Sequence, residues 1–195
     1  MKFRLLCVAL LPLVVSISQG GSLVSNDQFV LLPVKNDPTI SFRFVFLAGS
    51  ENDPKGKEGL AAITASMLTD AATKVNSYEA VLEKLYPLAA GYSAAVSVEQ
   101  ALITGRVYKD NLKEYYPLLM DAVLRPAFKQ DDLDRIKSQA VNYLENELRY
   151  SSDEELGKAV LYTTIFAGTG YGHITDGLVS SVKSITLDPY TYSNG

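Results

Sequence analysis

The chain has 195 residues, of which 47% are hydrophobic and 21% are charged, with 18 basic and 22 acidic residues. This length and composition are typical of one globular domain with a hydrophobic core. The basic residues are scattered and the net charge is negative, so we expect no nucleic acid partner.

The first twenty residues predict a secretory signal peptide. Lys2 and Arg4 make a basic start, an apolar run extends from Leu5 to Ile17, and the small residues Ser18 and Gly20 suit a cleavage site. The apolar run is too short to span a bilayer comfortably, although an uncleaved anchor is the alternative interpretation. We therefore expect an exported protein, periplasmic or extracellular, that has no membrane attachment once the signal is removed.

The predicted domain organisation follows from this leader. We expect a signal peptide over residues 1–20, a linker over 21–27 and one domain over 28–195. The only cysteine, Cys7, lies in the signal. The mature chain then has no thiol for a disulfide, a thiolate metal site or nucleophilic catalysis.

The hydrophobic pattern of the domain predicts alternating pairs of strands and helices. Phe42, Phe44 and Phe46 stand at every second position, which is typical of a strand with one buried face. Ser77 and Asp110 are suited to cap helices. We expect strands at 28–34, 41–46, 92–98 and 101–108, and helices at 59–72, 78–88, 112–124 (with a kink or a late start at Pro117), 131–149 and 154–166 (capped by Ser152 or Asp153).

Paired strands between paired helices indicate an α+β fold. We expect the four strands to share one antiparallel-rich sheet in a two-layer sandwich. The helices at 59–72 and 131–149 are predicted to pack on one face of this sheet, because the alternating phenylalanines need an apolar cover.

Four short stretches of the domain carry a resemblance to a known family. They are Gly49-Ser50-x-x-Asp53-Pro54-x-Gly56-Lys57-Glu58-Gly59-Leu60, Arg125-Pro126-x-Phe128 with Asp134-Arg135-x-Lys137, Asp153-Glu154-Glu155-Leu156, and Gly168-x-x-Tyr171-Gly172-His173. In order and spacing they resemble the N-terminal part of the insulinase/pitrilysin-type metallopeptidases, the inverzincins. The resemblance implies a further helix and a closing strand near residues 184–190, so we expect a metallopeptidase half-domain truncated at its C-terminus.

The resemblance also implies that a zinc motif has been lost. Active members carry His-x-x-Glu-His on the first helix, where two histidines bind zinc and the glutamate activates a water molecule. The matching positions here are Ala62, Ala65 and Ser66, whose side chains offer no imidazole and no carboxylate. The expected cofactor is therefore none, in contrast to the zinc of active members.

The family's third zinc ligand is a glutamate on the long helix, and Glu145 and Glu147 lie in that part of the chain. The resemblance does not choose between them. A lone carboxylate would hold no zinc tightly, because such sites need three protein ligands. The favoured interpretation of both residues is a solvated acidic face beside Arg149 and Lys137.

Other catalytic chemistries find little support in the sequence. His173 is the only histidine, and a local hydrogen bond at the end of a glycine-rich loop is favoured over a role as base or metal ligand. No Gly-x-Ser-x-Gly is present. The loop at 168–172 lacks the Lys-Ser/Thr that a phosphate-binding loop requires.

Three hypotheses about function remain from the sequence. The first is an exported, non-catalytic homologue that grips extended peptide as the partner of a zinc-bearing family subunit. The second is an active zinc peptidase with misplaced ligands, which would need at least two more histidines. The third is a stand-alone module that binds extended peptide by strand addition.

Overall fold

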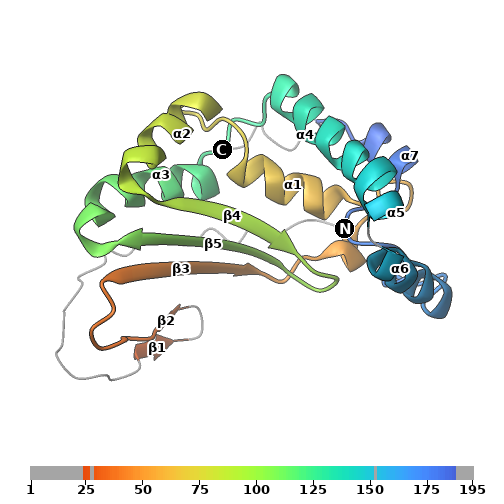
Figure 1. Cartoon of the computed structure of the whole chain (residues 1–195), viewed down its shortest axis with the longest axis horizontal. Coiled ribbons are helices and arrows are strands. Elements are labelled where there is room, and N and C mark those ends of the chain that lie inside the picture. The colour runs from red at the N-terminus through yellow and green to blue at the C-terminus, as the bar shows by residue number, and fades with distance from the viewer. Residues whose placement is uncertain (1–23, 27–28, 152, 188–195) are drawn as a thin grey trace. The chain divides into compact units, whose positions relative to one another are not determined.

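The computed structural model describes residues 24–26, 29–151 and 153–187 (Figure 1). The chain divides into two units, residues 1–37 and 38–195. The predicted signal peptide, the residues around 188–190 and the proposed cap Ser152 lie outside the described residues. No helix in the described part of the chain combines the length and the hydrophobicity that crossing a membrane requires.

The first unit contains a two-stranded antiparallel ribbon. Strand β1 (Val24–Asn26) pairs with β2 (Phe29–Leu31). The prediction that residues 28–34 belong to the main sheet is wrong, because β2 pairs with its neighbour in the chain. Pairing between adjacent segments closes a short loop and so costs little chain entropy.

The second unit is built on a three-stranded antiparallel sheet in the order β3-β5-β4. Its strands are β3 (Thr39–Phe46), β4 (Gly91–Val96) and β5 (Ala101–Tyr108). Strands β4 and β5 form a hairpin, closed by a hydrogen bond of 2.8 Å from Ser97 N to Gln100 O. The three predicted strands of this unit are therefore confirmed, with ends that differ by up to two residues.

The helices follow the predicted order. They are α1 (Leu60–Thr69), α2 (Tyr78–Leu85), α3 (Leu112–Leu124), α4 (Gln130–Asn142), α5 (Leu148–Ser151), α6 (Asp153–Ile165) and α7 (Val179–Ser184). A π-helical turn, Tyr143–Glu147, joins α4 to α5, so the predicted long helix is continuous in direction but changes its hydrogen-bonding pattern there. Ser77 caps α2, since its Oγ accepts from Ala80 N at 3.2 Å. Asp110 instead lies in a 3₁₀ turn, and Asn111 takes the N-cap position of α3.

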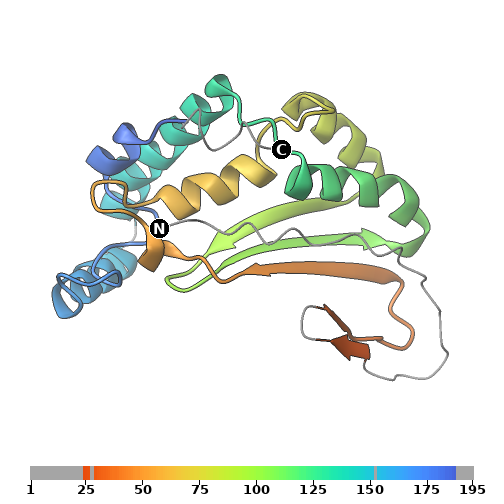
Figure 2. The ribbon, with the colours of Figure 1, turned by 180° about the vertical axis from the view of Figure 1, so that it is seen from behind.

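Helices α1, α2 and α3 cover the inner face of the sheet, and α2 and α3 form one core with it (Figures 1 and 2). Ile103 and Val107 of β5 are buried there against Val81 of α2 and Leu119 of α3. Phe42 and Phe44 pack on this core as predicted, whereas Phe46, at the end of β3, is 39% exposed. The α+β class, with an antiparallel sheet and helices on one face, is confirmed.

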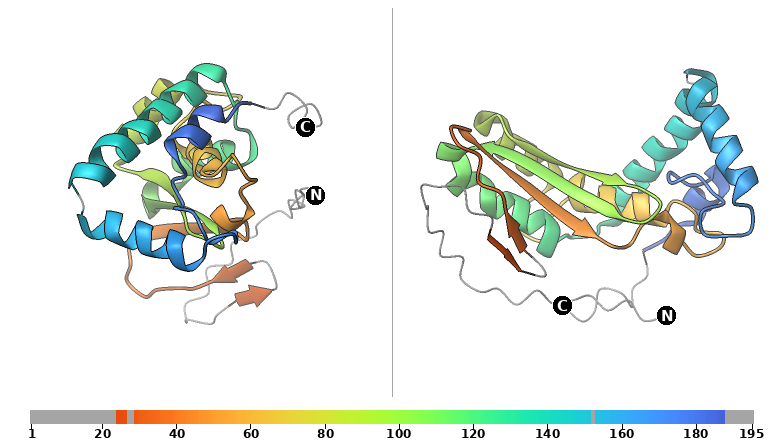
Figure 3. Two further views of the ribbon diagram at one scale, coloured as in Figure 1. Left: turned by 90° about the vertical axis from the view of Figure 1, so that its right-hand side faces the viewer. Right: turned by 90° about the horizontal axis from the view of Figure 1, so that it is seen from below.

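The position of the long helix differs from the prediction. Helix α1 contacts β4 and β5, but α4 packs on α1 and α7 rather than on the sheet (Figure 3). Ile63 and Met67 of α1 form a second core with Ile136 of α4 and Val182 of α7. Because α1, α2 and α3 already cover the sheet, the apolar stripe of α4 is buried against α1 instead.

Tyr115 sets the distance between α3 and the sheet. It is fully buried, and its hydroxyl donates to Gly91 O at 2.8 Å. A Cβ at Gly105 would lie 2.1 Å from this hydroxyl oxygen, whereas a Cβ at Gly91 would meet no atom within 4 Å. Gly105 is therefore required by close packing, and Gly91 is not.

We expect Gly105→Ala to lower the free energy of unfolding by about 1–3 kcal/mol, because the methyl group overpacks this contact. Gly91→Ala is the matched control in the partner strand and should change stability by less than about 0.5 kcal/mol. Urea unfolding of both variants measures the difference. Equal stability of the two variants would contradict the packing described here.

Candidate functional site

The loop before α1 fixes the start of that helix. Asp53 Oδ2 accepts a hydrogen bond from Gly59 N at 2.7 Å, and Asp53 Oδ1 accepts one from Ala61 N at 2.8 Å. A carboxylate at this place satisfies free amide groups and interacts favourably with the helix dipole. Partial burial nevertheless raises the pKa of Asp53, since desolvation outweighs the two hydrogen bonds.

The same loop is bound to the segment that leads into α7. Gly59 has a φ of +96°, and a Cβ there would lie 2.8 Å from Asp176 O, so only glycine fits. Ser181 Oγ donates to Glu58 O at 2.9 Å, and Ser184 Oγ donates to Gly56 O at 3.0 Å. The position of the loop before α1 relative to α7 thus depends on contacts between residues more than a hundred positions apart in sequence.

One face of α1 lines a cavity of about 250 Å³. Ala62, Ser66 and Asp70 are four residues apart and therefore lie on one side of the helix. The remaining lining residues are Ile63, Ile136, Gln139, Ala140, Tyr143 and Asp176. Ala65 does not line this cavity and is buried in the core at 4% exposure. The structure therefore brings two of the three motif positions to the long helix.

The two glutamates predicted for the third-ligand position do not line this cavity. Glu145 and Glu147 are exposed, and Glu145 Oε1 lies 3.4 Å from Lys183 Nζ of α7. Tyr143 lines the cavity instead, on the same helical side as Ala140 and Ile136. The apolar stripe of the long helix already indicates this side, and both glutamates fall outside it.

The side chain of Tyr143 places a neutral phenol on the side of the cavity formed by the long helix. Burial raises its pKa, and the negative charges of Asp176, Glu155 and Glu147 raise it further. The phenol therefore stays protonated at neutral pH.

His173 makes a local contact, in keeping with the structural interpretation of this residue. Its Nδ1 lies 3.0 Å from Ile174 O, while its Nε2 is buried and has no hydrogen-bond partner among the described residues. Within residues 24–26, 29–151 and 153–187, no group of three or more histidine, cysteine, aspartate or glutamate residues is arranged to hold a metal ion.

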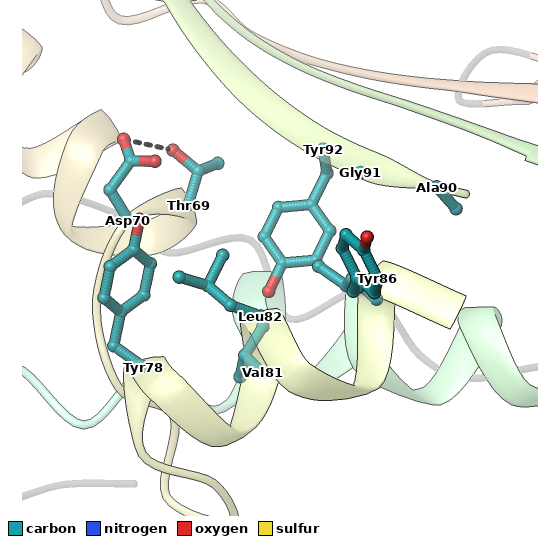
Figure 4. Close-up of a pocket in the computed structure, with 10 residues that line it drawn as sticks. Thr69, Asp70, Tyr78, Val81, Leu82, Tyr86, Ala90, Gly91 and Tyr92 are labelled. Carbon is teal, nitrogen blue, oxygen red and sulfur yellow. Dashed lines mark hydrogen bonds between the residues drawn. The ribbon is translucent and has the colours of Figure 1, made fainter. Parts of the chain in front are cut away.

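A second cavity, of about 290 Å³, adjoins the first at the C-terminal end of α1 (Figure 4). Asp70 lines both cavities. The other lining residues are Thr69, Tyr78, Val81, Leu82, Leu85, Tyr86, Ala90, Gly91 and Tyr92. No sequence pattern predicts this cavity, because its tyrosines come from three separate elements and each alone is typical of an ordinary amphipathic segment.

The fold and the helix-lined cavity define a peptidase-type half-domain, and a family model supports that conclusion directly. The model of insulinase, peptidase family M16, matches residues 29–175. The chain therefore belongs to the insulinase family, M16. A search of curated proteins gave no significant match.

Solved structures share this fold. A peptidase M16 inactive domain from Pseudomonas fluorescens is 23% identical with a TM-score of 0.74, over 85% of this chain and 40% of that one. A protease from Helicobacter pylori is 16% identical with a TM-score of 0.70, over 85% and 40%. Pitrilysin is 17% identical with a TM-score of 0.67, over 78% and 16%. The present chain thus spans 40% or less of the length of these structures.

The side chains around Ala62 and Ser66 do not fit the zinc ion that the family implies. Gln139, Ala140 and Tyr143 add an amide, a methyl group and a neutral phenol, and no imidazole lines the cavity. Asp70 and Asp176 are its two carboxylates, one fewer than the three protein ligands of a catalytic zinc site.

Asp53→Ala should destabilise the domain by about 0.5–2 kcal/mol, because two amide groups at the start of α1 lose their acceptor. Asp53→Asn keeps one side-chain acceptor oxygen and should cost less. Thermal unfolding of the two variants gives the comparison, and an unchanged midpoint for Asp53→Ala would show that α1 does not depend on this cap.

Position 143 lies on the cavity side of the long helix and is our candidate for the third ligand of a rebuilt zinc site. We expect the variant Ala62→His, Ala65→Glu, Ser66→His, Tyr143→Glu to bind zinc at least about tenfold more tightly than the same variant with Tyr143→Gln, because glutamate adds an anionic ligand to the two neutral imidazoles. Competition with a chromophoric chelator measures both affinities.

If Tyr143→Gln and Tyr143→Glu gave equal zinc affinity in this background, position 143 would not complete the site. A further Glu145→Gln substitution is the control for the sequence-based assignment. A large loss of affinity on that substitution would favour Glu145 as the ligand.

Proposed function

We propose that this chain is an exported, non-catalytic homologue of the insulinase-type zinc peptidases, which grips extended peptide and works with a zinc-bearing family subunit. One observation carries the proposal. Helix α1 has a cavity-lining face against the long helix, and Ala62 and Ser66 on that face occupy two of the three positions of the zinc motif. This arrangement supports retention of the peptide-binding framework without the metal chemistry.

The residues around the cavity support binding rather than hydrolysis. Zinc-dependent hydrolysis needs an activated water and a general base near the scissile bond. Ala62 and Ser66 provide neither, and Ala65 is buried away from the cavity. The hydroxyl of Ser66 and the amide of Gln139 are suited to hydrogen bonds with a peptide.

The edge of the sheet offers a place for an extended chain. Strand β4 ends the order β3-β5-β4, so within the described residues one edge of β4 has no strand partner. Helix α1 lies beside β4, and Gly91 and Tyr92 line the second cavity. A peptide added to this edge by main-chain hydrogen bonds would pass the cavities, which could take its side chains.

The proposed zinc-bearing partner and the proposed export are supported by observations outside the cavity. The predicted signal peptide supports export. The fold is similar to a structure described as a peptidase M16 inactive domain, and the chain spans 40% of that structure, which supports work alongside further family domains. A stand-alone peptide-binding module is the second candidate, because the free edge of β4 requires no partner.

The proposal predicts a metal-free, inactive chain that binds peptide. The purified mature protein should contain less than about 0.1 zinc per chain, since its cavity lacks three protein ligands, and should show no chelator-sensitive hydrolysis of fluorogenic peptides. Metal analysis by mass spectrometry and a fluorescence assay measure these two properties. One zinc per chain, or hydrolysis that a chelator abolishes, would contradict the proposal.

A family peptidase from the same organism that carries His-x-x-Glu-His separates the two candidates. Co-expression should yield a stable complex if the chain is a subunit, and the complex should cleave peptides faster than the zinc-bearing chain alone. Separate elution of the two chains with unchanged cleavage would favour the stand-alone module.

A further inference from the structure

The cavity at the end of α1 has an aromatic wall. Tyr78 comes from the start of α2, Tyr86 from the 3₁₀ turn after it and Tyr92 from β4. Figure 4 shows the rings of Tyr78 and Tyr92 on either side of Leu82, with Tyr86 next to Tyr92. Burial raises the pKa of Tyr78 and of Tyr92, so both rings stay neutral at physiological pH. Neutral aromatic rings around a cavity are suited to a cation.

The cavity also contains one carboxylate with an incomplete set of partners. Asp70 Oδ2 accepts a hydrogen bond from Thr69 Oγ1 at 3.2 Å. The nearest cation, Arg135, does not line the cavity: its guanidinium lies 4.5 Å from the ring centroid of Tyr78, donates to the backbone O of Asp70 and pairs with Asp132 at 3.0 Å. Arg135 therefore pairs with Asp132, and within the described residues Asp70 forms no salt bridge of its own.

The carboxylate of Asp70 is partly removed from water in this cavity, which disfavours its ionised form. Partial burial raises the pKa of Asp70, and only the hydroxyl of Thr69 and the more distant charge of Arg135 act against it. A cation that enters the cavity would favour the ionised carboxylate.

The remaining wall is aliphatic. Val81, Leu82 and Leu85 of α2 line the cavity between the tyrosines. Lysine and arginine have just this combination of an apolar stem and a cationic head, and the stem of either residue can pack along an apolar surface.

We propose that this cavity is a specificity site for a basic side chain, lysine or arginine, of the peptide that binds along β4. The inference rests on the proposed peptide-binding function and names the side-chain class that this function selects. The ammonium or guanidinium group pairs with Asp70, the aliphatic stem lies on Leu82 and Leu85, and the rings of Tyr78 and Tyr92 flank it.

The position of the cavity sets where the basic residue stands in the peptide. Ala62 and Asp70 are eight residues apart along α1, which corresponds to about 12 Å. An extended peptide rises about 3.3 Å per residue, so this distance is covered by about three to four residues. The basic side chain therefore stands three or four positions from the peptide residue that lies beside Ala62.

Peptide binding tests the inference. Three extended peptides of identical sequence, with lysine, norleucine or glutamate at one position, are titrated against the full mature chain by fluorescence anisotropy. We expect the lysine peptide to bind at least about tenfold more tightly than the norleucine peptide, because norleucine has the same stem without the charge. This preference should diminish as the pH is lowered through the pKa of Asp70, while norleucine binding stays constant.

Matched variants assign the preference to the cavity. Asp70→Asn should abolish the lysine preference, and Asp176→Asn, which makes the same charge change in the neighbouring cavity, should leave it intact. Tyr86→Ala should weaken lysine binding severalfold without loss of stability, because Tyr86 is 88% exposed. Thermal unfolding of each variant provides the folding control.

A second experiment distinguishes a failure of this inference from a failure of the proposed peptide-binding function. Nα-acetyl-lysine N-methylamide and its norleucine analogue are added to the chain while NMR signals of Tyr78 and Tyr92 are followed. Shifts with the lysine compound alone, lost in Asp70→Asn, would support the cavity even if no peptide bound, and the peptide-binding function would then fail by itself. Equal peptide affinities for lysine and norleucine, no shifts with the lysine compound, or a preference that survives in Asp70→Asn would overturn the inference.

Discussion

The burial of α1 between the sheet and the long helix is the constraint on which the rest of the structure depends. Ile63 and Met67 fill the core shared with α4 and α7, and the helix contacts β4 on its other side. Asp53 fixes where the helix begins, and the contacts of Glu58 and Gly59 with the α7 segment fix its environment. With the helix held in this way, the side chains at positions 62, 66 and 70 necessarily line the two cavities.

This constraint also explains how the fold can persist without a metal. The core around α1 is formed by apolar side-chain contacts and backbone hydrogen bonds, and the side chains of Ala62 and Ser66 are not part of it. Small side chains at the cavity-facing positions 62 and 66 are compatible with that packing. Structural stability and metal chemistry are therefore separable in this domain, which is the physical basis of the proposed binding role.

Local sequence signals predicted most of the elements but less of their packing. The alternation of Phe42 and Phe44 identified β3, and Ser77 identified the start of α2, because both signals act within a few residues. The pairing of β2 with β1 and the docking of α4 on α1 were not predicted, since they depend on which apolar surface remains uncovered once other elements have packed.

The sequence-based choice of Glu145 and Glu147 as third-ligand candidates relied on their residue type. The helical periodicity of the apolar stripe instead indicates Tyr143, which lies on the side of the long helix that faces the cavity. The tyrosine-lined cavity gave no sequence signal at all, since its residues are assembled from separate elements.

Hydrogen–deuterium exchange with a saturating extended peptide, in the presence of a chelator, tests the account most directly. The account predicts that backbone amides of β4, Gly91–Val96, become protected while those of β3 do not change, because the peptide adds to the β4 edge without a metal. Unchanged exchange in β4, or protection that the chelator abolishes, would contradict it.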